Sequence, residues 1–240
     1  TRRSSDLYPV RIMSRDLKVI AHIRTEYKDK FGIPRQSGME TSMPAVIIFE
    51  PEYRDRSAVK GLDGFSHIWV LWEFSKAERD KWSPTVRPPR LGGNRRMGVF
   101  ATRSPFRPNA IGLSSLKLEK IEYTAESGPV LHVTGADMLD MTPIYDIKPY
   151  LTFCDSHPDA VSGFAAEYED YRLKVHIPDD ISGGIDPDIL KGITDVLALD
   201  PRPSYQNDPE RIYKMDVAGY FIEFCVQGNT AFVKTLEKRK

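Results

Sequence analysis

Short apolar runs of period two, with no helix between them, constrain the fold of this chain most. In residues 16–24 the apolar side chains Leu17, Val19, Ala21 and Ile23 alternate with mostly polar neighbours, as in a half-buried strand. Further runs rich in Val, Ile, Leu and aromatic residues cover 45–49, 67–74, 116–123, 130–135 and 144–151. Parallel strands need crossover helices, which are missing here. The pattern therefore predicts a mainly β fold, an antiparallel or mixed sheet curled or closed into a barrel.

The pattern changes after Pro158. Residues 158–169 carry apolar side chains at helical spacing, and Asp186 followed by Pro187 is typical of a helix N-terminus. Apolar runs at 220–226 and 230–234 flank a Gly-Asn pair, a hairpin signature. We expect a small α+β C-terminal domain over residues 158–240, a β-barrel domain over 16–157 and an N-terminal tail over 1–15.

The composition excludes several classes of protein. The 240 residues, 40% of them hydrophobic, are enough to bury a core, but no apolar run approaches the roughly 20 residues that cross a bilayer. The first residues also lack the apolar segment of a secretory signal. Two cysteines and five scattered histidines show no metal-ligand spacing. We expect a soluble protein of the cytoplasm, without a membrane segment, a disulfide framework or a bound metal.

Charge is distributed unevenly, although the net charge is zero. Residues 81–117 contain no Asp or Glu, and six arginines lie between Arg87 and Arg107. Residues 155–210 carry thirteen acids against four basic residues. The basic stretch and the acidic stretch suggest two modules, and only the module with the basic stretch has the character of a nucleic-acid surface.

The stretch 87–112, RPPRLGGNRRMGVFATRSPFRPNAIG, combines this arginine density with prolines, glycines and two phenylalanines. Proline and glycine fix an irregular path, and long irregular loops in compact domains are usually functional. The arginine fork pairs with phosphate or carboxylate and stacks on bases, which suits RNA. The alternative is a solvated basic loop paired with the acidic C-terminal domain.

A second cluster, GADMLDMTPIYDIKPYL at 135–151, gathers Asp137, Asp140 and Asp146 with Tyr145 and Lys148. These carboxylates could be general bases, anchors for a cationic ligand, salt-bridge partners of the arginine loop, or turn caps. Phosphate-loop, dinucleotide-binding, serine-hydrolase and zinc-protease motifs are absent from the sequence.

Residues 64–74, GFSHIWVLWEF, place a lone histidine at the head of an apolar strand. His67 is either a structural histidine or a catalytic one, and the sequence alone favours the first. Trp69 and Trp72 are most simply core residues.

Five motifs together resemble the TsaA-like (TrmO-like) family of tRNA N6-methyltransferases. They are FGIPRQ (31–36), LDGFSHIWVLWEF (62–74), RPPRLGGN (87–94), RMGVFATRSPFRPNAIGLS (96–114) and LDMTPIYDIKPYL (139–151). The resemblance covers nearly all of residues 16–157. A weaker likeness at 198–208, ALDPRPSYQND, is similar to the C-terminal extension of the family.

The resemblance implies an S-adenosylmethionine-dependent enzyme on a β-barrel, acting as a homodimer on N6-threonylcarbamoyladenosine beside the anticodon of certain tRNAs. By matching positions, it implies these cofactor contacts: Pro34, Arg35, Gln36, His67, Ile68, Arg103, Leu113, Asp140, Met141, Thr142 and Pro143. The chain departs from the family pattern at Met141, where a glycine is usual, and at Ala110, where a proline is common.

Methyl transfer is an in-line displacement that needs positioning and an acceptor for the proton lost from nitrogen. The candidate bases, which the sequence does not rank, are Asp140, Asp146, Tyr145 and His67. We expect Arg87, Arg90, Arg96 and Arg107 to bind tRNA phosphates or the threonyl carboxylate. Two rival interpretations are a non-catalytic RNA-binding adaptor, and an S-adenosylmethionine enzyme acting on a small anionic metabolite.

Overall fold

The computed structural model describes residues 16–39, 42–77, 81–88, 95–202 and 208–239. Six strands close into a barrel in the order β1-β2-β7-β6-β3-β8, and every neighbouring pair is antiparallel. The barrel strands are β1 (Ala21–Arg24), β2 (Pro44–Phe49), β3 (His67–Glu73), β6 (Ile111–Thr124), β7 (Gly128–Thr134) and β8 (Thr142–Pro149). The predicted barrel is therefore confirmed.

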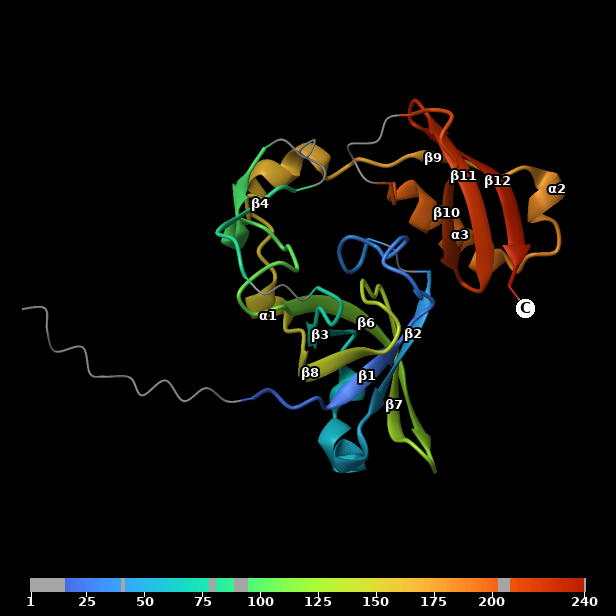
Figure 1. The fold of residues 1–240 in the computed structure, drawn as a ribbon. Coiled ribbons are helices and arrows are strands. Elements are labelled where there is room, and N and C mark those ends of the chain that lie inside the picture. Colours follow the sequence, from blue (N-terminus) through green and yellow to red (C-terminus); the bar gives the residue numbers. More distant parts are fainter. Residues whose placement is uncertain (1–15, 40–41, 78–80, 89–94, 203–207, 240) are drawn as a thin grey trace, which may run out of the picture.

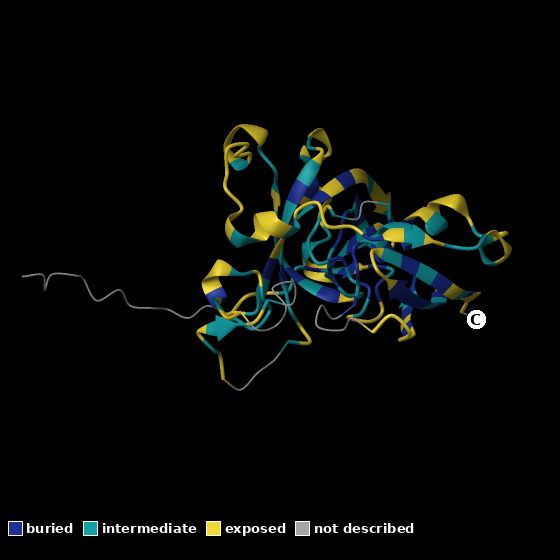
Figure 2. Cartoon of the chain, turned by 90° about the horizontal axis from the view of Figure 1, so that it is seen from above, coloured by how far each residue is buried: buried dark blue, intermediate teal, exposed yellow. Residues whose placement is uncertain are grey.

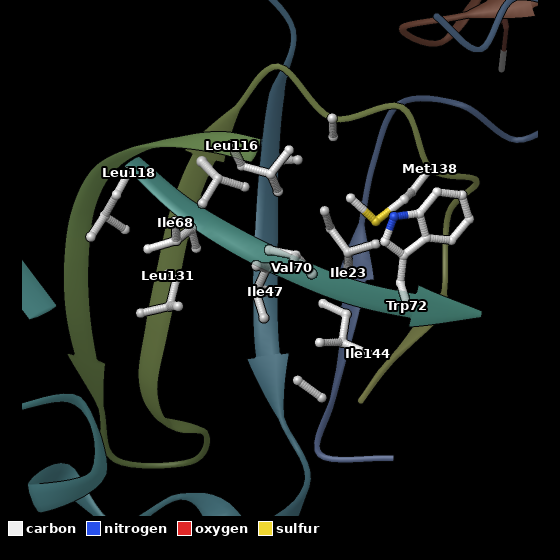
Figure 3. Close-up of a cluster of buried hydrophobic side chains, with 14 of the residues drawn as sticks. Ile23, Ile47, Ile68, Val70, Trp72, Leu116, Leu118, Leu131, Met138 and Ile144 are labelled. Atoms are coloured by element: carbon white, nitrogen blue, oxygen red, sulfur yellow. The ribbon is translucent and has the colours of Figure 1, made fainter. Parts of the chain in front are cut away.

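The barrel core consists of the alternate side chains that the period-two pattern points inward. In β3, Ile68, Val70 and Trp72 are buried, while the side chains between them are half-buried. Figure 3 shows Ile23, Ile47, Leu116, Leu131 and Ile144 converging on the same interior from five other strands. Figure 2 shows the same division, with buried residues inside and exposed ones at the outer turns.

Short helical turns and a small arm decorate the barrel. The 3-10 turns are η1 (Pro51–Tyr53), η2 (Arg56–Val59), η3 (Leu62–Gly64) and η5 (Val99–Ala101). Strands β4 (Thr85–Val86) and β5 (Met97–Gly98) pair only with each other and form an arm that stands off the barrel (Figure 1).

The C-terminal part forms a four-stranded sheet in the order β10-β11-β12-β9, with β9 parallel to β12. The helix α1 (Thr152–Asp155) still lies beside the barrel (Figure 1), and the turn η6 (Gly163–Tyr168) follows it. The elements of the C-terminal part are β9 (Lys174–His176), α2 (Asp179–Ser182), α3 (Pro187–Ala198), β10 (Tyr213–Val217), β11 (Tyr220–Gln227) and β12 (Thr230–Lys238). Asp186 caps α3 by accepting bonds from the N–H groups of Asp188 and Ile189, as its sequence predicts. The predicted hairpin is also present, as β11 and β12.

The prediction of an amphipathic helix over 158–169 is wrong. Only the 3-10 turn η6 forms there, and Gly163 adopts a left-handed φ of 55° that interrupts any longer helix. The apolar face finds no core, since Val161 is 92% exposed. Helical spacing alone does not supply the packing that stabilises a short helix.

The connection between β1 and β2, residues 25–43, joins the barrel to the C-terminal part, because its side chains pack into the C-terminal core. Tyr27 and Met43 are buried among side chains of α3 and the C-terminal sheet, and Phe31 and Ile33 pack against the same cluster. Figure 1 shows this connection reaching from the barrel toward that sheet. A segment of the first domain therefore completes the core of the second.

Candidate active site

A cavity of about 620 Å³ opens where the end of β3 and the start of β6 meet two loops. The first loop is the β1–β2 connection, which contributes residues 33–36, and the second is the arginine-rich stretch, which contributes Thr102, Arg103, Pro105, Phe106 and Arg107. Pockets of about 300–1,000 Å³ are typical of small-molecule sites. Segments that lie far apart in the sequence thus form one concave site.

An aromatic wall lines this cavity. Trp69, Trp72 and Phe74 contribute to it from β3 and its end, and the rings of Trp72 and Phe74 lie 4.3 Å apart between centroids. Gly112 lies directly against the indole of Trp72, so that a Cβ at this position would overlap the ring. The expectation that Trp69 is a core residue is wrong, because it is only half-buried and its Nε1 donates to Asp155 Oδ2 at 2.9 Å.

A hydrogen-bonded chain leads from this wall to a carboxylate. Trp72 Nε1 donates to Ser114 Oγ at 2.9 Å, and Ser114 Oγ donates to Asp137 Oδ1 at 2.5 Å. Ser114 is fully buried, and Asp137 lines the cavity. Burial raises the pKa of the Asp137 carboxyl, against the opposing effects of the bonds from Ser114 and the Ser37 N–H and of the Arg103 charge.

Two arginines organise the loops around the cavity. Arg103 Nη1 donates to Gln36 Oε1 at 2.5 Å and joins the arginine-rich loop to the β1–β2 connection. Arg35 Nη2 donates to the carbonyl oxygens of Asp200 and Arg202, at 3.1 and 2.9 Å. Residues predicted as cofactor contacts therefore also hold the walls of the site together.

The structure brings together about half of the predicted cofactor residues. The cavity is lined by Pro34, Arg35, Gln36, Arg103, Leu113 and Thr142. The other predicted contacts do not line it: His67, Ile68, Asp140, Met141 and Pro143. Ile68 is fully buried in the barrel core, and His67 stands at the opposite end of β3 from Glu73.

The four candidate bases also lie outside the cavity lining. Asp140 pairs with Lys28 Nζ at 2.7 Å and Arg24 Nε at 3.3 Å. Burial alone would raise the pKa of Asp140, but the bonds from Lys28 and the Thr25 N–H outweigh it, so that the pKa lies below its ordinary value. Burial and a hydrogen bond with Glu73 raise the pKa of Tyr145 to about 12. Asp146 pairs with Lys148 at 2.8 Å. His67 Nδ1 shares a hydrogen bond with Ser66 Oγ at 2.9 Å.

The four arginines expected to bind RNA separate into two groups. Arg87 and Arg96 are exposed on the β4–β5 arm, where Arg96 Nη1 donates to Thr85 Oγ1. Arg107 lines the cavity instead, and its Nη1 donates to the carbonyl oxygen of Thr102 at 3.0 Å. Arg90 lies outside the described residues.

The site also contains Ser114 and Glu73, which the sequence did not single out, and Asp137, for which a role as general base was one of several alternatives. Asp137, Ser114 and Glu73 belong to it through their positions on three different barrel segments. Asp137 stood out only as one of three aspartates within a short stretch. Its proximity to Ser114 and Trp72 depends on how β3, β6 and the segment after β7 are brought together, which no local pattern reveals.

The described residues show neither a metal site nor a membrane-spanning helix. No group of three or more His, Cys, Asp or Glu side chains there has a metal-binding arrangement. No helix of the described part of the chain is long and apolar enough to cross a membrane.

Comparison with known proteins covers both parts of the chain. Residues 22–156 match the tRNA-methyltransferase O N-terminal domain, and residues 183–239 match the TrmO C-terminal domain. A tRNA (adenine(37)-N6)-methyltransferase of Eikenella corrodens is 50% identical over 173 residues, which are 72% of this chain and 97% of that protein.

A putative S-adenosylmethionine-dependent methyltransferase of Pseudomonas aeruginosa is 38% identical over 211 residues, which cover 84% of this chain and 88% of that protein. The crystal structure of TrmO from the same species has a TM-score of 0.76 at 28% identity and covers 95% of this chain and 99% of that one.

Proposed function

The chain belongs to the tRNA-methyltransferase O family, and we propose that its cavity transfers a methyl group from S-adenosylmethionine to N6 of adenine-37 in tRNA. The observation that carries the proposal is the cavity itself, where an aromatic wall, a buried carboxylate and an arginine-rich loop meet. The names of the relatives support the same activity.

The residues present fit the cofactor. A sulfonium cation and a purine are both attracted to aromatic faces, which Trp69, Trp72 and Phe74 provide. Pro34, Gln36, Arg103 and Leu113 would hold the cofactor against this wall. When bound there, S-adenosylmethionine supplies the electrophilic methyl group.

The protein's own contribution is to position the acceptor and to exclude water. The Arg103–Gln36 hydrogen bond joins the arginine-rich loop to the β1–β2 connection, and Arg35 joins the same connection to the C-terminal domain. Arg107 fixes the path of its own loop. These contacts give the cavity walls a defined shape before a substrate enters.

We propose that the acceptor is N6-threonylcarbamoyladenosine. The arginines around the cavity and the arm support this choice, because the threonyl carboxylate and the neighbouring phosphates are both anions that guanidinium groups bind. Arg87, Arg90 and Arg96 would bind phosphates, and Arg107 is close enough to the cavity to meet the nucleoside.

The test is transfer of labelled methyl groups to two transcripts of one tRNA, with adenine-37 either unmodified or carrying the threonylcarbamoyl group. Label should enter the anticodon-loop fragment of the second transcript alone. Label in both transcripts would mean that the enzyme does not require the threonylcarbamoyl group. If neither transcript is labelled although S-adenosylmethionine binds in calorimetry, a small anionic acceptor is favoured. If S-adenosylmethionine does not bind either, the non-catalytic RNA-binding adaptor is favoured.

We further propose that the enzyme is a homodimer of the cytoplasm. Exposed apolar side chains such as Phe153 and Val161 are of the kind that subunit interfaces cover. Both cysteines, Cys154 and Cys225, are free thiols, which suits a reducing compartment. Light scattering of the purified protein tests the dimer, and a monomeric mass would contradict it.

A further inference from the structure

We propose that Asp137 is the proton acceptor of the methyl transfer, and that Ser114 and Trp72 position its carboxylate. The inference rests on the proposed function, since it concerns the same reaction at N6. It replaces the four bases that the sequence suggested with a residue inside the cavity.

The geometry fixes the Asp137 carboxylate at the cavity lining, where the Ser37 N–H also donates to it. Oδ1 accepts from Ser114 Oγ at 2.5 Å, and Ser114 in turn accepts from the Trp72 indole at 2.9 Å. Both donors are buried and belong to paired barrel strands, because Trp72 lies opposite Gly112 in the β3–β6 register. The carboxylate is therefore oriented by buried side chains of two paired barrel strands, which gives a base the fixed position that it needs.

The four bases suggested by the sequence are weaker candidates. Asp140 and Asp146 are each paired with cationic side chains, and like His67 they lie off the cavity lining. Tyr145 holds its proton through the neutral pH range, because its pKa is about 12. Asp137 forms no ion pair within 4 Å among the described side chains.

The reaction balances with Asp137 as acceptor. The lone pair of N6 forms the bond to the methyl carbon, the carbon–sulfur bond breaks, and its electron pair stays on sulfur. The proton of N6 passes to the carboxylate of Asp137 and leaves to solvent after product release. A base is needed because the carbonyl beside N6 withdraws its lone pair and makes it a poor nucleophile.

Burial raises the pKa of Asp137 above its ordinary value, which makes it a better base than an exposed aspartate. The charged groups that line the same cavity are Lys30, Arg35, Glu73, Lys76, Arg103 and Arg107. Of these, Arg103 acts on Asp137 directly and opposes the shift. Since the base works only when deprotonated, activity should fall as the pH drops through this raised pKa.

The experiment compares the wild type with Asp137→Asn under saturating S-adenosylmethionine and tRNA. We expect kcat to fall by about 10²–10⁴-fold. The decrease of kcat at low pH, the acid limb of its pH profile, should disappear. Cofactor affinity in calorimetry and the unfolding temperature should stay near wild-type values. Loss of cofactor affinity with kcat retained would overturn the proposal and make Asp137 a cofactor anchor.

A second readout does not depend on activity. In the protein without ligands, the carboxyl ¹³C resonance of Asp137 should titrate above the ordinary value of about 3.9. Ser114→Ala removes a bond that favours the charged carboxylate, so both this midpoint and the acid limb of kcat should move to higher pH. A purely structural serine would change stability and leave the two midpoints in place.

Glu73→Gln is the matched variant, because Glu73 is the other carboxylate on the cavity lining. If Glu73→Gln, and not Asp137→Asn, removes the acid limb, Glu73 is the base and the proposal is wrong. An inactive wild type would instead count against the proposed function, so the two failures are distinguishable.

Discussion

Met141 holds a left-handed backbone conformation, with φ of 63°, at the turn that leads into β8. Its N–H donates to the carbonyl of Ile23 at 2.8 Å, which ties this turn to β1, and its side chain is 48% exposed. A glycine is usual here in the family that the chain resembles. The conformation explains that usage, because only glycine adopts it without steric cost.

Met141→Gly should therefore stabilise the protein. Relief of the left-handed strain, of roughly 1–2 kcal/mol, exceeds the entropy that glycine adds to the unfolded chain, of about 0.4–1 kcal/mol. We expect a rise in Tm of about 1–3 °C in differential scanning calorimetry. Met141→Ala is the control, since it shortens the side chain but keeps the strain. An equal rise in both variants would mean that the methionine side chain, not the backbone, was unfavourable.

Gly112 is required for a different reason, the close approach of Trp72. Gly112→Ala should push the indole away and lower the free energy of unfolding by about 1–3 kcal/mol. The shift should also weaken the Trp72 bond to Ser114 and reduce cofactor affinity in calorimetry. Gly64→Ala serves as the control, because a Cβ there meets no atom within 4 Å. Equal stability of the two variants would contradict the close packing.

At the scale of elements, the arm of β4 and β5 gathers exposed basic and aromatic side chains. Arg87, Arg95 and Arg96 are exposed there, and the rings of Trp82 and Phe100 lie 6.3 Å apart. The arm has only two residues in each strand, so its own pairing contributes little to the core. Its composition suits contact with an RNA backbone and unpaired bases.

Removing two arm charges should reduce the salt dependence of tRNA binding. In Arg87→Ala/Arg96→Ala we expect the slope of log K against log salt to become shallower by about 1.4–1.8, and the affinity at low salt to fall. Filter binding over a range of salt concentrations measures this slope. Lys234→Ala/Lys238→Ala removes the same charge from the C-terminal sheet and should leave the slope unchanged. Equal slopes in all three proteins would contradict phosphate contacts by the arm.

At the scale of the whole molecule, the barrel and the C-terminal domain are joined through the β1–β2 connection. Tyr27 and Met43 lie in the C-terminal core, Ser42 Oγ donates to Asp195 of α3 at 2.9 Å, and Arg35 contacts the carbonyls of residues 200 and 202. The same connection supplies Pro34, Arg35 and Gln36 to the cavity. Folding of the C-terminal domain thus shapes the site, although none of its described residues lines the cavity.

A fragment that ends at residue 157 should be less stable than the barrel within the full chain. Exposure of Tyr27 and Met43 costs about 3–6 kcal/mol, at 1.5–3 kcal/mol for each buried side chain. We expect a lower Tm, binding of a hydrophobic dye and weaker cofactor binding. Arg35→Ala in the full chain keeps this core and should show only the last effect. A fragment with unchanged Tm and cofactor affinity would show that the barrel is independent.

The sequence alone was sufficient for the barrel, for the capped helix α3 and for the β11–β12 hairpin. Each is a local pattern: alternation along strands such as β3, the Asp186-Pro187 pair before α3, and a Gly-Asn turn. The family was also recognisable, because its motifs are contiguous segments. Two arginines of the arginine-rich stretch, Arg103 and Arg107, line the cavity, and their expected contacts with cofactor and RNA stay predictions.

Only the tertiary structure decided which of these residues meet. Asp137, Ser114 and Trp72 lie on different segments, and their hydrogen-bonded chain follows from barrel closure and strand register. His67 and Trp69 are two residues apart on β3, yet only Trp69 lines the cavity. Alternation and motif spacing set which side of a strand a residue takes, but the approach of distant segments depends on packing across the whole chain.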